Sequence, residues 1–445
     1  MIVLSRLFVL LVIVLAGAIN AQALDVKLSE SVLDNGMQVI VIPDHRTQIV
    51  THSVWYRVGA ADEASGKTGL AHFLEHLLFK GTTKFPQKTF DRLLALNGAE
   101  GNAFTTPDHT MYFQRTTADR LPLMMELEAD RMQNLVLTEE IVKPELQVVR
   151  EERRQRTENE PSALLSEQVE AALFTAHPYG RPTIGWMSEV AKLTMNDALA
   201  FYKQHYTPAN AVLVVAGDIE PQVVIDLAIK YYGPLTNSFM PQPRIRTDEP
   251  TPLVARRLTM KDVRVSSPYV ARTYLAPSYT SERKADALSL DFLSAILGSG
   301  SKSRLSQSLV LDQKLATYIG AWFDGSRRDY AEFMIYAVPN PGVDLNKLEA
   351  AMDAVLADVQ KSGVTQAEID RVRNQALAEQ VYALDSQTSL VNSIGTTVMS
   401  GRPAASTFDT SDWLTVTPAS IANALSAYVR PENSVTSILL PVAKP

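Results

Sequence analysis

Two histidines and a glutamate lie close together in an otherwise apolar stretch, "GLAHFLEHLLFKGT", which covers residues 69–82. His72 and His76 are four residues apart, so on a helix their imidazoles share one face and are close enough to bind one metal ion. Glu75 directly precedes His76 and could take a proton from a metal-bound water. The pattern H-x-x-E-H is a known zinc-binding motif. We therefore interpret the stretch as a metal site, in preference to a helix whose histidines are only hydrogen-bonded.

A catalytic zinc site needs a third protein ligand, because two histidines leave the coordination incomplete. The chain has no cysteine, so this ligand must be a histidine, an aspartate or a glutamate. A predicted charged helix, "PELQVVREERRQRTENEP", offers Glu145, Glu151 and Glu152. Acidic residues on such a helix usually only face solvent, so their type alone does not select one of the three.

The composition indicates a globular protein with room for more than one domain. The chain has 445 residues, of which 46% are hydrophobic, and such a chain can fill substantial cores. The formal net charge is −7, and no basic run or basic-aromatic stripe is present. These features argue against a nucleic-acid partner.

An internal repeat divides the chain into two halves. The segment "LTMNDALAFYKQHYTPANAVLVVAG" resembles "VTPASIANALSAYVRPENSVTSILLP", and the same interval separates Thr194 from Thr417 and Pro208 from Pro431. Each half reads as alternating strands, a helix, a strand pair, long charged helices and a closing helix and strand. The sequence therefore predicts an α+β fold with two homologous domains, each with helices packed on a mostly antiparallel sheet.

The predicted domains are residues 24–235, which carry the metal site, and residues 259–445, which lack it. Between them, residues 236–258 include the proline-rich stretch "MPQPRIRTDEPTP" and are predicted to be a linker. At the position of the H-x-x-E-H motif the second half has Ser289, Phe292 and Leu293. We therefore expect one Zn²⁺ per chain.

The first 23 residues have the features of a cleavable signal peptide. Arg6 precedes an apolar run over residues 7–19, and a small-residue site, Ala21-Gln22-Ala23, follows the run. The run is short for a membrane span, which argues against a retained anchor. We expect an exported protein without a stable membrane anchor, located in the periplasm or secreted.

The motifs resemble those of the pitrilysin, insulin-degrading enzyme and mitochondrial processing peptidase family, in its short bacterial form. The similarity covers nearly all of the mature chain, and the motifs occur in the family's order: "GLAHFLEHLLFKGT", "NGAEGNAFTTPDHTMYF", "VVREERRQRTENEP", "HPYGRPTIG" and "YTPANAVLVVAGDI". The resemblance implies two related domains that close around a substrate chamber.

The resemblance also implies roles for single residues. His72 and His76 match the family's histidine ligands, and Glu75 matches its general base. The third ligand in the family ends the pattern E-x6-E, which here selects Glu152, with Glu151 as the alternative.

Two further groups of residues match the family's pattern around the site. Glu145 matches an acid that orients a ligating histidine through the outer shell. Asn102, Ala103 and Phe104 match an edge strand onto which peptide substrates are laid. An ordinary sheet strand would need no special residues at these three positions.

One departure from the family concerns the second domain. Active members place an arginine seven residues before a tyrosine there, and both contact the substrate. Here Tyr318 is the candidate substrate-binding tyrosine, but Leu311 stands seven residues before it and the nearest earlier arginine is Arg304. Either another residue substitutes, or a second, related chain supplies the pair in a heterodimer, and we favour the second explanation.

The expected function is therefore that of an exported zinc metalloendopeptidase, which hydrolyses peptides or unfolded segments through a metal-activated water. We expect it to work as a dimer. The alternative is a non-catalytic or partner-dependent subunit of a heterodimeric complex, because the fold also occurs in inactive subunits. The sequence does not specify the substrate.

Overall fold

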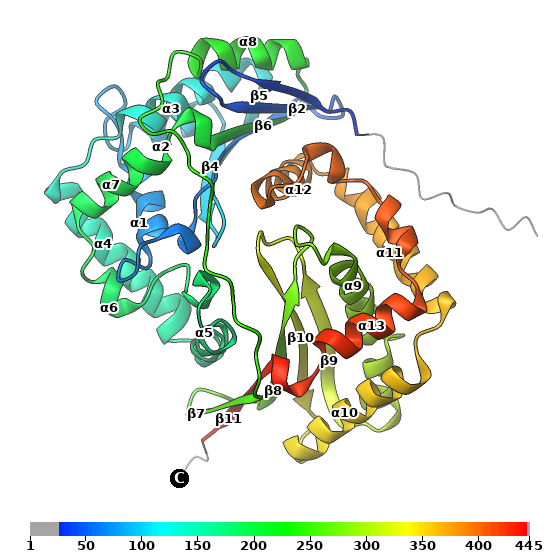
Figure 1. Ribbon diagram of the computed structural model, residues 1–445. Coiled ribbons are helices and arrows are strands. Elements are labelled where there is room, and N and C mark those ends of the chain that lie inside the picture. The colour runs from blue at the N-terminus through cyan, green and yellow to red at the C-terminus, as the bar shows by residue number, and fades with distance from the viewer. Residues whose placement is uncertain (1–25, 443–445) are drawn as a thin grey trace, which may run out of the picture.

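Two domains, each with helices packed on a sheet, make up residues 26–442, which are the residues that this computed structural model describes (Figure 1). The strands of the first domain are β1 (Ser29–Val32), β2 (Gln38–Pro43), β3 (Ile49–Tyr56), β4 (Glu100–Thr105), β5 (Thr110–Thr117) and β6 (Ala211–Gly217). Its helices are α1 (Leu70–Leu77), α2 (Thr89–Leu96), α3 (Leu121–Asn134), α4 (Glu139–Arg153), α5 (Pro161–Leu173), α6 (Met187–Val190), α7 (Met195–His205) and α8 (Pro221–Tyr231). The strands of the second domain are β7 (Arg256–Asp262), β8 (Tyr269–Pro277), β9 (Ala316–Asp324), β10 (Tyr330–Pro339) and β11 (Ser434–Pro441). Its helices are α9 (Lys284–Gly298), α10 (Leu345–Ser362), α11 (Gln366–Ala383), α12 (Gln387–Ser400) and α13 (Pro418–Tyr428).

The two sheets have matching strand orders. The first runs β1-β2-β6-β3-β5-β4 and the second β7-β11-β8-β10-β9. Neighbouring strands are antiparallel except β2 with β6 and β7 with β11, which are parallel. The predicted α+β class with two homologous domains is thus confirmed. The strands β4 and β9 occupy equivalent edges of the two sheets.

The repeated sequence motif builds the same local structure twice. Thr194 and Thr417 cap the N-termini of α7 and α13, and each side chain accepts a hydrogen bond from a backbone N–H in the first turn. Asn210 and Asn433 donate from their side-chain amides to carbonyls at the ends of these helices, at 2.9 and 2.8 Å. These contacts set the turns that lead into the strands β6 and β11.

Each domain contributes one helix to the other domain's sheet. Helix α5 of the first domain packs against β7, β8 and β11, and helix α12 of the second domain packs against β3 and β6 (Figure 1). On α12, Leu390 and Ile394 share an apolar cluster with Ile40, Trp55 and Val212 of the first sheet. This exchange holds the two domains together through buried apolar side chains.

The connector between the domains, residues 236–255, forms neither helix nor strand. Strand β7 begins at Arg256, inside the predicted linker 236–258, because the last proline of the stretch is Pro252 and the chain beyond it is free to pair with β11. The connector is nevertheless fixed to the first domain. The carboxylate of Glu249 accepts hydrogen bonds from the backbone N–H groups of residues 175–177, at 2.8 to 2.9 Å.

Within residues 26–442, no helix has both the length and the apolar character needed to cross a membrane. The predicted signal peptide, residues 1–23, lies outside the described residues.

Candidate metal centre

Helix α1, which carries the H-x-x-E-H motif, is anchored along its apolar face and at its N-terminus. Phe73 and Leu74 are completely buried in the core of the first domain. The carboxylate of Glu63 accepts hydrogen bonds from the backbone N–H groups of Gly69 and Ala71, at 3.0 and 2.7 Å. An acidic group here pairs with N–H groups that the helix itself leaves unsatisfied. The motif is therefore held on a fixed helix.

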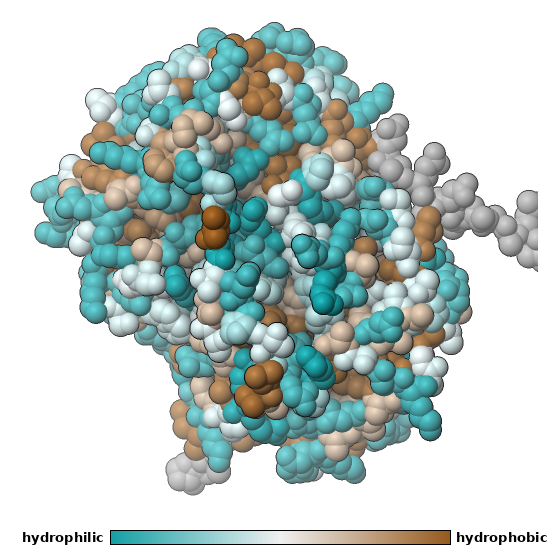
Figure 2. Space-filling view, in the orientation of Figure 1, coloured by the Kyte–Doolittle hydropathy of each residue, from teal (hydrophilic) through white to brown (hydrophobic). Residues whose placement is uncertain are grey.

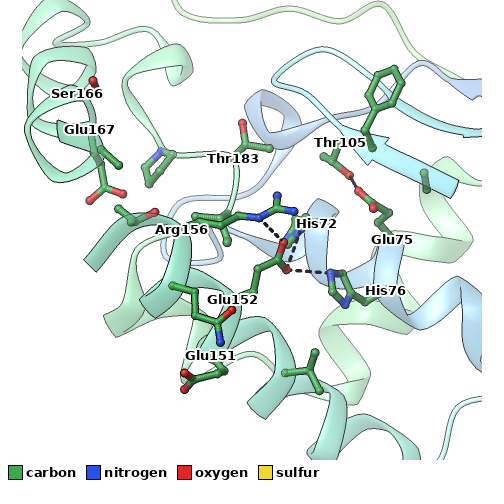
Figure 3. A pocket seen from close by; sticks show the side chains of 18 of the residues that line it. His72, Glu75, His76, Thr105, Glu151, Glu152, Arg156, Ser166, Glu167 and Thr183 are labelled. Atoms are coloured by element: carbon green, nitrogen blue, oxygen red, sulfur yellow. Dashed lines mark hydrogen bonds and ion pairs between the residues drawn. The ribbon is translucent and has the colours of Figure 1, made fainter. Parts of the chain in front are cut away.

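His72 and His76 from α1 and Glu152 from α4 converge on one point (Figure 3). Glu152 Oε2 lies 3.1 Å from His76 Nε2 and 3.6 Å from His72 Nε2. The three ligand atoms all lie within 4.8 Å of one another, and residues 26–442 contain no second group of this kind. Glu151, the alternative ligand, points away from the histidines and binds Arg154 at 2.9 Å.

The distances from Glu152 Oε2 to the two imidazole nitrogens, 3.1 and 3.6 Å, are close to those of a zinc site. In a tetrahedral site with bonds of roughly 2.0–2.2 Å, neighbouring ligand atoms are roughly 3.3–3.6 Å apart. Glu152 Oε2 is buried. Within the described part of the chain, no group forms a hydrogen bond of good geometry with it. A buried carboxylate oxygen that faces two imidazole nitrogens in this way is suited to share a cation with them.

Glu145 fixes the orientation of His76. Its Oε1 accepts a hydrogen bond from His76 Nδ1 at 2.9 Å, and its Oε2 pairs with Lys80 Nζ at 2.5 Å. Burial would raise the pKa of Glu145, but the hydrogen bonds with His76 and Lys80 bring it below its usual value. The proton on Nδ1 of His76 leaves Nε2 free to act as a metal ligand.

The two histidines differ in their affinity for protons. Burial, together with the nearby His76, lowers the pKa of His72 to about 4. Burial opposes protonation of His76 as well, but its hydrogen bond to Glu145 and the facing carboxylate of Glu152 raise its pKa to about 9. Because a ligating imidazole nitrogen must be unprotonated, His72 is ready to bind a cation, whereas His76 must release a proton.

Glu75 lies in the same cavity as the histidines, but it is held apart from them (Figure 3). Its Oε2 accepts a hydrogen bond from the Thr105 hydroxyl at 2.6 Å. Burial is the largest effect on its pKa and raises it above the usual value. A carboxylate with a raised pKa holds a transferred proton better, which suits a general base.

The cavity around these residues has a volume of about 1010 Å³. The predicted substrate-binding residues Asn102, Ala103 and Phe104 line it, together with Thr105. They lie on β4, which pairs with β5 on one side and is the last strand of its sheet on the other. A peptide could therefore form backbone hydrogen bonds with the free edge of β4.

The structure does not bring Tyr318 to this cavity, whose lining residues all belong to the first domain. Tyr318 lies on the edge strand β9, where its half-exposed ring stacks on Trp322 with the ring centroids 6.2 Å apart. Arg304 does not substitute for the missing arginine, because two hydrogen bonds of 2.8 and 2.9 Å bind it to Glu368. The assignment of Tyr318 as a substrate-binding residue is thus not supported by the geometry of the chain alone.

Two further residues support the site and were not singled out from the sequence. Arg156 Nε contacts Glu152 Oε1 at 3.0 Å, and Lys80 holds Glu145. Arg156 follows Glu152 by four residues, a spacing that pairs charges on a helix, so this contact could have been predicted. The pairing of Lys80 with Glu145 joins distant parts of the chain and leaves no local signal.

Comparisons with known proteins identify the family. Residues 38–186 match the insulinase domain of peptidase family M16, and residues 192–376 match the peptidase M16 inactive domain. The chain is 33% identical over 384 residues to the zinc protease PqqE of Helicobacter pylori, with 85% of each chain covered. The chain therefore belongs to the M16 family of peptidases, which confirms the resemblance seen in its motifs.

Solved structures share the whole fold. A crystal structure of a protease from Helicobacter pylori has a TM-score of 0.85 at 31% identity, and the match covers 94% of this chain and 100% of that chain. A peptidase M16 inactive domain from Pseudomonas fluorescens has a TM-score of 0.81 at 17% identity, with 94% and 99% covered. The fold thus occurs both in a protein described as a protease and in one described as inactive.

Proposed function

We propose that this chain is a zinc metalloendopeptidase that hydrolyses peptides or unfolded segments. The observation that carries the proposal is the convergence of His72, His76 and Glu152 beside Glu75 in one large cavity. Membership in a family with relatives named zinc proteases supports it.

The residues of the site suit hydrolysis by an attacking water. A zinc ion held by His72, His76 and Glu152 would lower the pKa of a bound water and polarise the scissile carbonyl. Glu75 takes the proton of the attacking water at its carboxylate and returns it to the leaving amine. Thr105 holds this carboxylate in position. The free edge of β4 binds the substrate backbone in an extended conformation.

The substitution Glu75→Gln tests the assignment of the general base. We expect the variant to bind one zinc ion per chain, as the unaltered chain does, and to cleave internally quenched peptides at least about a hundredfold more slowly. Metal analysis and the initial rate of cleavage, with and without chelator, measure the two effects. Cleavage by the variant at the original rate would contradict the proposal.

A partner-dependent form of the enzyme is the second candidate. It is favoured by Leu311 in place of the expected arginine and by the pairing of Arg304 with Glu368. On this proposal a related subunit supplies the arginine and tyrosine, and the chain alone binds zinc but cleaves peptides slowly. Adding a co-expressed M16 chain that carries the pair should then raise the rate. A full rate without any partner would exclude this form.

We also propose that the protein is exported to the periplasm and that residues 1–23 are removed. This proposal is supported by the order of residue types in the segment: a charged residue comes first, an apolar run follows, and small residues stand at the end. N-terminal sequencing of the protein from a periplasmic fraction should begin at Leu24. A cytosolic protein with an intact N-terminus would contradict the proposal.

A further inference from the structure

The connector, residues 236–255, carries two largely buried arginines: Arg244 contacts the first domain, and Arg246 contacts both domains. Arg244 Nη2 donates to Asp62 at 2.6 Å, and Arg246 Nη2 donates to the same carboxylate at 3.0 Å. Arg246 Nη1 also donates to Asp108 of the first domain at 2.5 Å and to Asp329 of the second at 2.7 Å. In Figure 1 the connector runs down the front of the molecule to β7, and this face is largely hydrophilic in Figure 2.

Two more arginines approach this network without a strong anionic partner. Arg57 donates to the Gln38 side chain at 2.9 Å and pairs with no carboxylate within residues 26–442. Burial lowers the pKa of Arg57, and the nearby charges of Arg244 and Arg328 lower it further. The guanidinium group of Arg328 pairs with no carboxylate in the described part of the chain other than Asp329, at 3.9 Å.

The network therefore holds one positive charge too many. Four guanidinium groups, those of residues 57, 244, 246 and 328, face three carboxylates, those of residues 62, 108 and 329. His205 does not alter this excess at neutral pH, because burial lowers its pKa to about 4. The adjacent Glu63 does not offset the excess, because burial raises its pKa well above the usual value and its carboxylate binds the backbone N–H groups of Gly69 and Ala71.

Arg57 and Arg244 line a cavity of about 420 Å³ beneath the connector. Arg244 Nη1 is buried and has no acceptor among the described residues. This cavity shares no lining residue with the one at the metal site. It combines an unused buried donor, a mostly buried arginine without a counter-ion and a net positive charge.

We propose that this cavity binds a small oxyanion, a carboxylate or a phosphate, between the guanidinium groups of Arg57 and Arg244. Excess buried charge is costly unless it is paired, and planar guanidinium groups bind carboxylates and phosphates through two parallel hydrogen bonds. Arg57 follows strand β3, whereas Arg244 lies on the connector. The bound anion therefore ties the connector to the first domain and stabilises the arrangement of the two domains.

Thermal unfolding of the full chain tests the site without any requirement for peptidase activity. Inorganic phosphate or acetate replaces chloride at constant ionic strength and pH. We expect at least one of the two anions to raise the Tm of the unaltered protein in a saturable manner. The rise should be about 2 °C at an anion concentration about ten times the Kd. Arg57→Gln should abolish this rise, and Arg57→Lys, which keeps the charge, should restore part of it. Arg92→Gln, which removes an exposed charge on α2, should leave the rise intact.

Calorimetric titration of the folded proteins with the same two anions measures binding directly. Saturable binding of phosphate alone identifies a phosphate site, and binding of acetate identifies a carboxylate site. Either result, if it is lost in Arg57→Gln, supports the proposal. No saturable binding of either anion, or equal binding by Arg57→Gln and the unaltered protein, would overturn it.

Discussion

The two carboxylate oxygens of Glu152 have different partners. Oε1 contacts Arg156, and Oε2 faces the two imidazole nitrogens of the motif helix. The spacing H-x-x-E-H was sufficient to predict the histidines as a pair on one helix face. The choice of Glu152 over Glu151 required the family resemblance, because it depends on which face of α4 turns toward α1. The sequence of α4 alone does not contain that information.

Glu170 on α5 is a second residue with an unusual environment; it lines the cavity of the metal site but is not one of the three candidate ligands. It forms no ion pair in the described part of the chain, and burial followed by the nearby Glu332 raises its pKa to about 7, against the opposing charge of Arg327. The folded state therefore retains a proton that the unfolded chain loses above its ordinary pKa. The free energy of unfolding is therefore highest below the ordinary pKa of the group. It falls by on the order of 2–3 kcal/mol as the pH rises to about 7.

The substitution Glu170→Gln should remove this dependence. We expect the variant to gain stability over the unaltered protein as the pH rises from about 4.5 to 7, because glutamine does not titrate. Urea unfolding of both proteins at several pH values measures the difference in their free energies of unfolding. The metal-site residues titrate in both proteins, so their contribution cancels in this difference. The exposed Glu282→Gln is the control. A stability difference that does not change with pH would contradict the raised pKa.

At the scale of elements, the repeated sequence predicted the matching helices and strands, including the capping threonines Thr194 and Thr417. It did not predict that α5 and α12 each cover the other domain's sheet. The apolar positions of a helix show which face is buried, but both sheets present similar apolar faces. Which sheet a helix covers is decided by the path of the chain between elements.

Gly395 marks the close contact of α12 with the first sheet. A Cβ atom at this position would lie 2.2 Å from ring atoms of the fully buried Trp55. Alanine would favour the helix by about 1 kcal/mol, but overpacking a core typically costs about 1–3 kcal/mol. We expect Gly395→Ala to lower the free energy of unfolding in urea. Ser393→Ala on the same helix should change it by less than about 0.5 kcal/mol, and an unchanged or more stable Gly395→Ala would show that the contact is loose.

At the scale of the whole molecule, the first domain carries the candidate metal centre, and the helices α5 and α12 join it to the second domain. The prolines predicted the connector, but not its attachment through Arg244 and Arg246, since ion pairs between distant residues leave no local pattern in a sequence. For the same reason the sequence suggested Tyr318 as a substrate contact, whereas the fold places it on the outer strand of the second sheet. Within residues 26–442 the chain therefore brings together the three residues of a candidate metal site, but it does not bring Tyr318 to the same cavity.

The central claim is that His72, His76 and Glu152 together hold one zinc ion. Its most direct test is the zinc content of the purified chain compared with Glu152→Ala and the neighbouring Glu151→Ala. We predict one zinc per chain in the unaltered protein and in Glu151→Ala, and little in Glu152→Ala, because three protein ligands are needed for a stable site. Full zinc content in Glu152→Ala, or its loss in Glu151→Ala, would contradict the account.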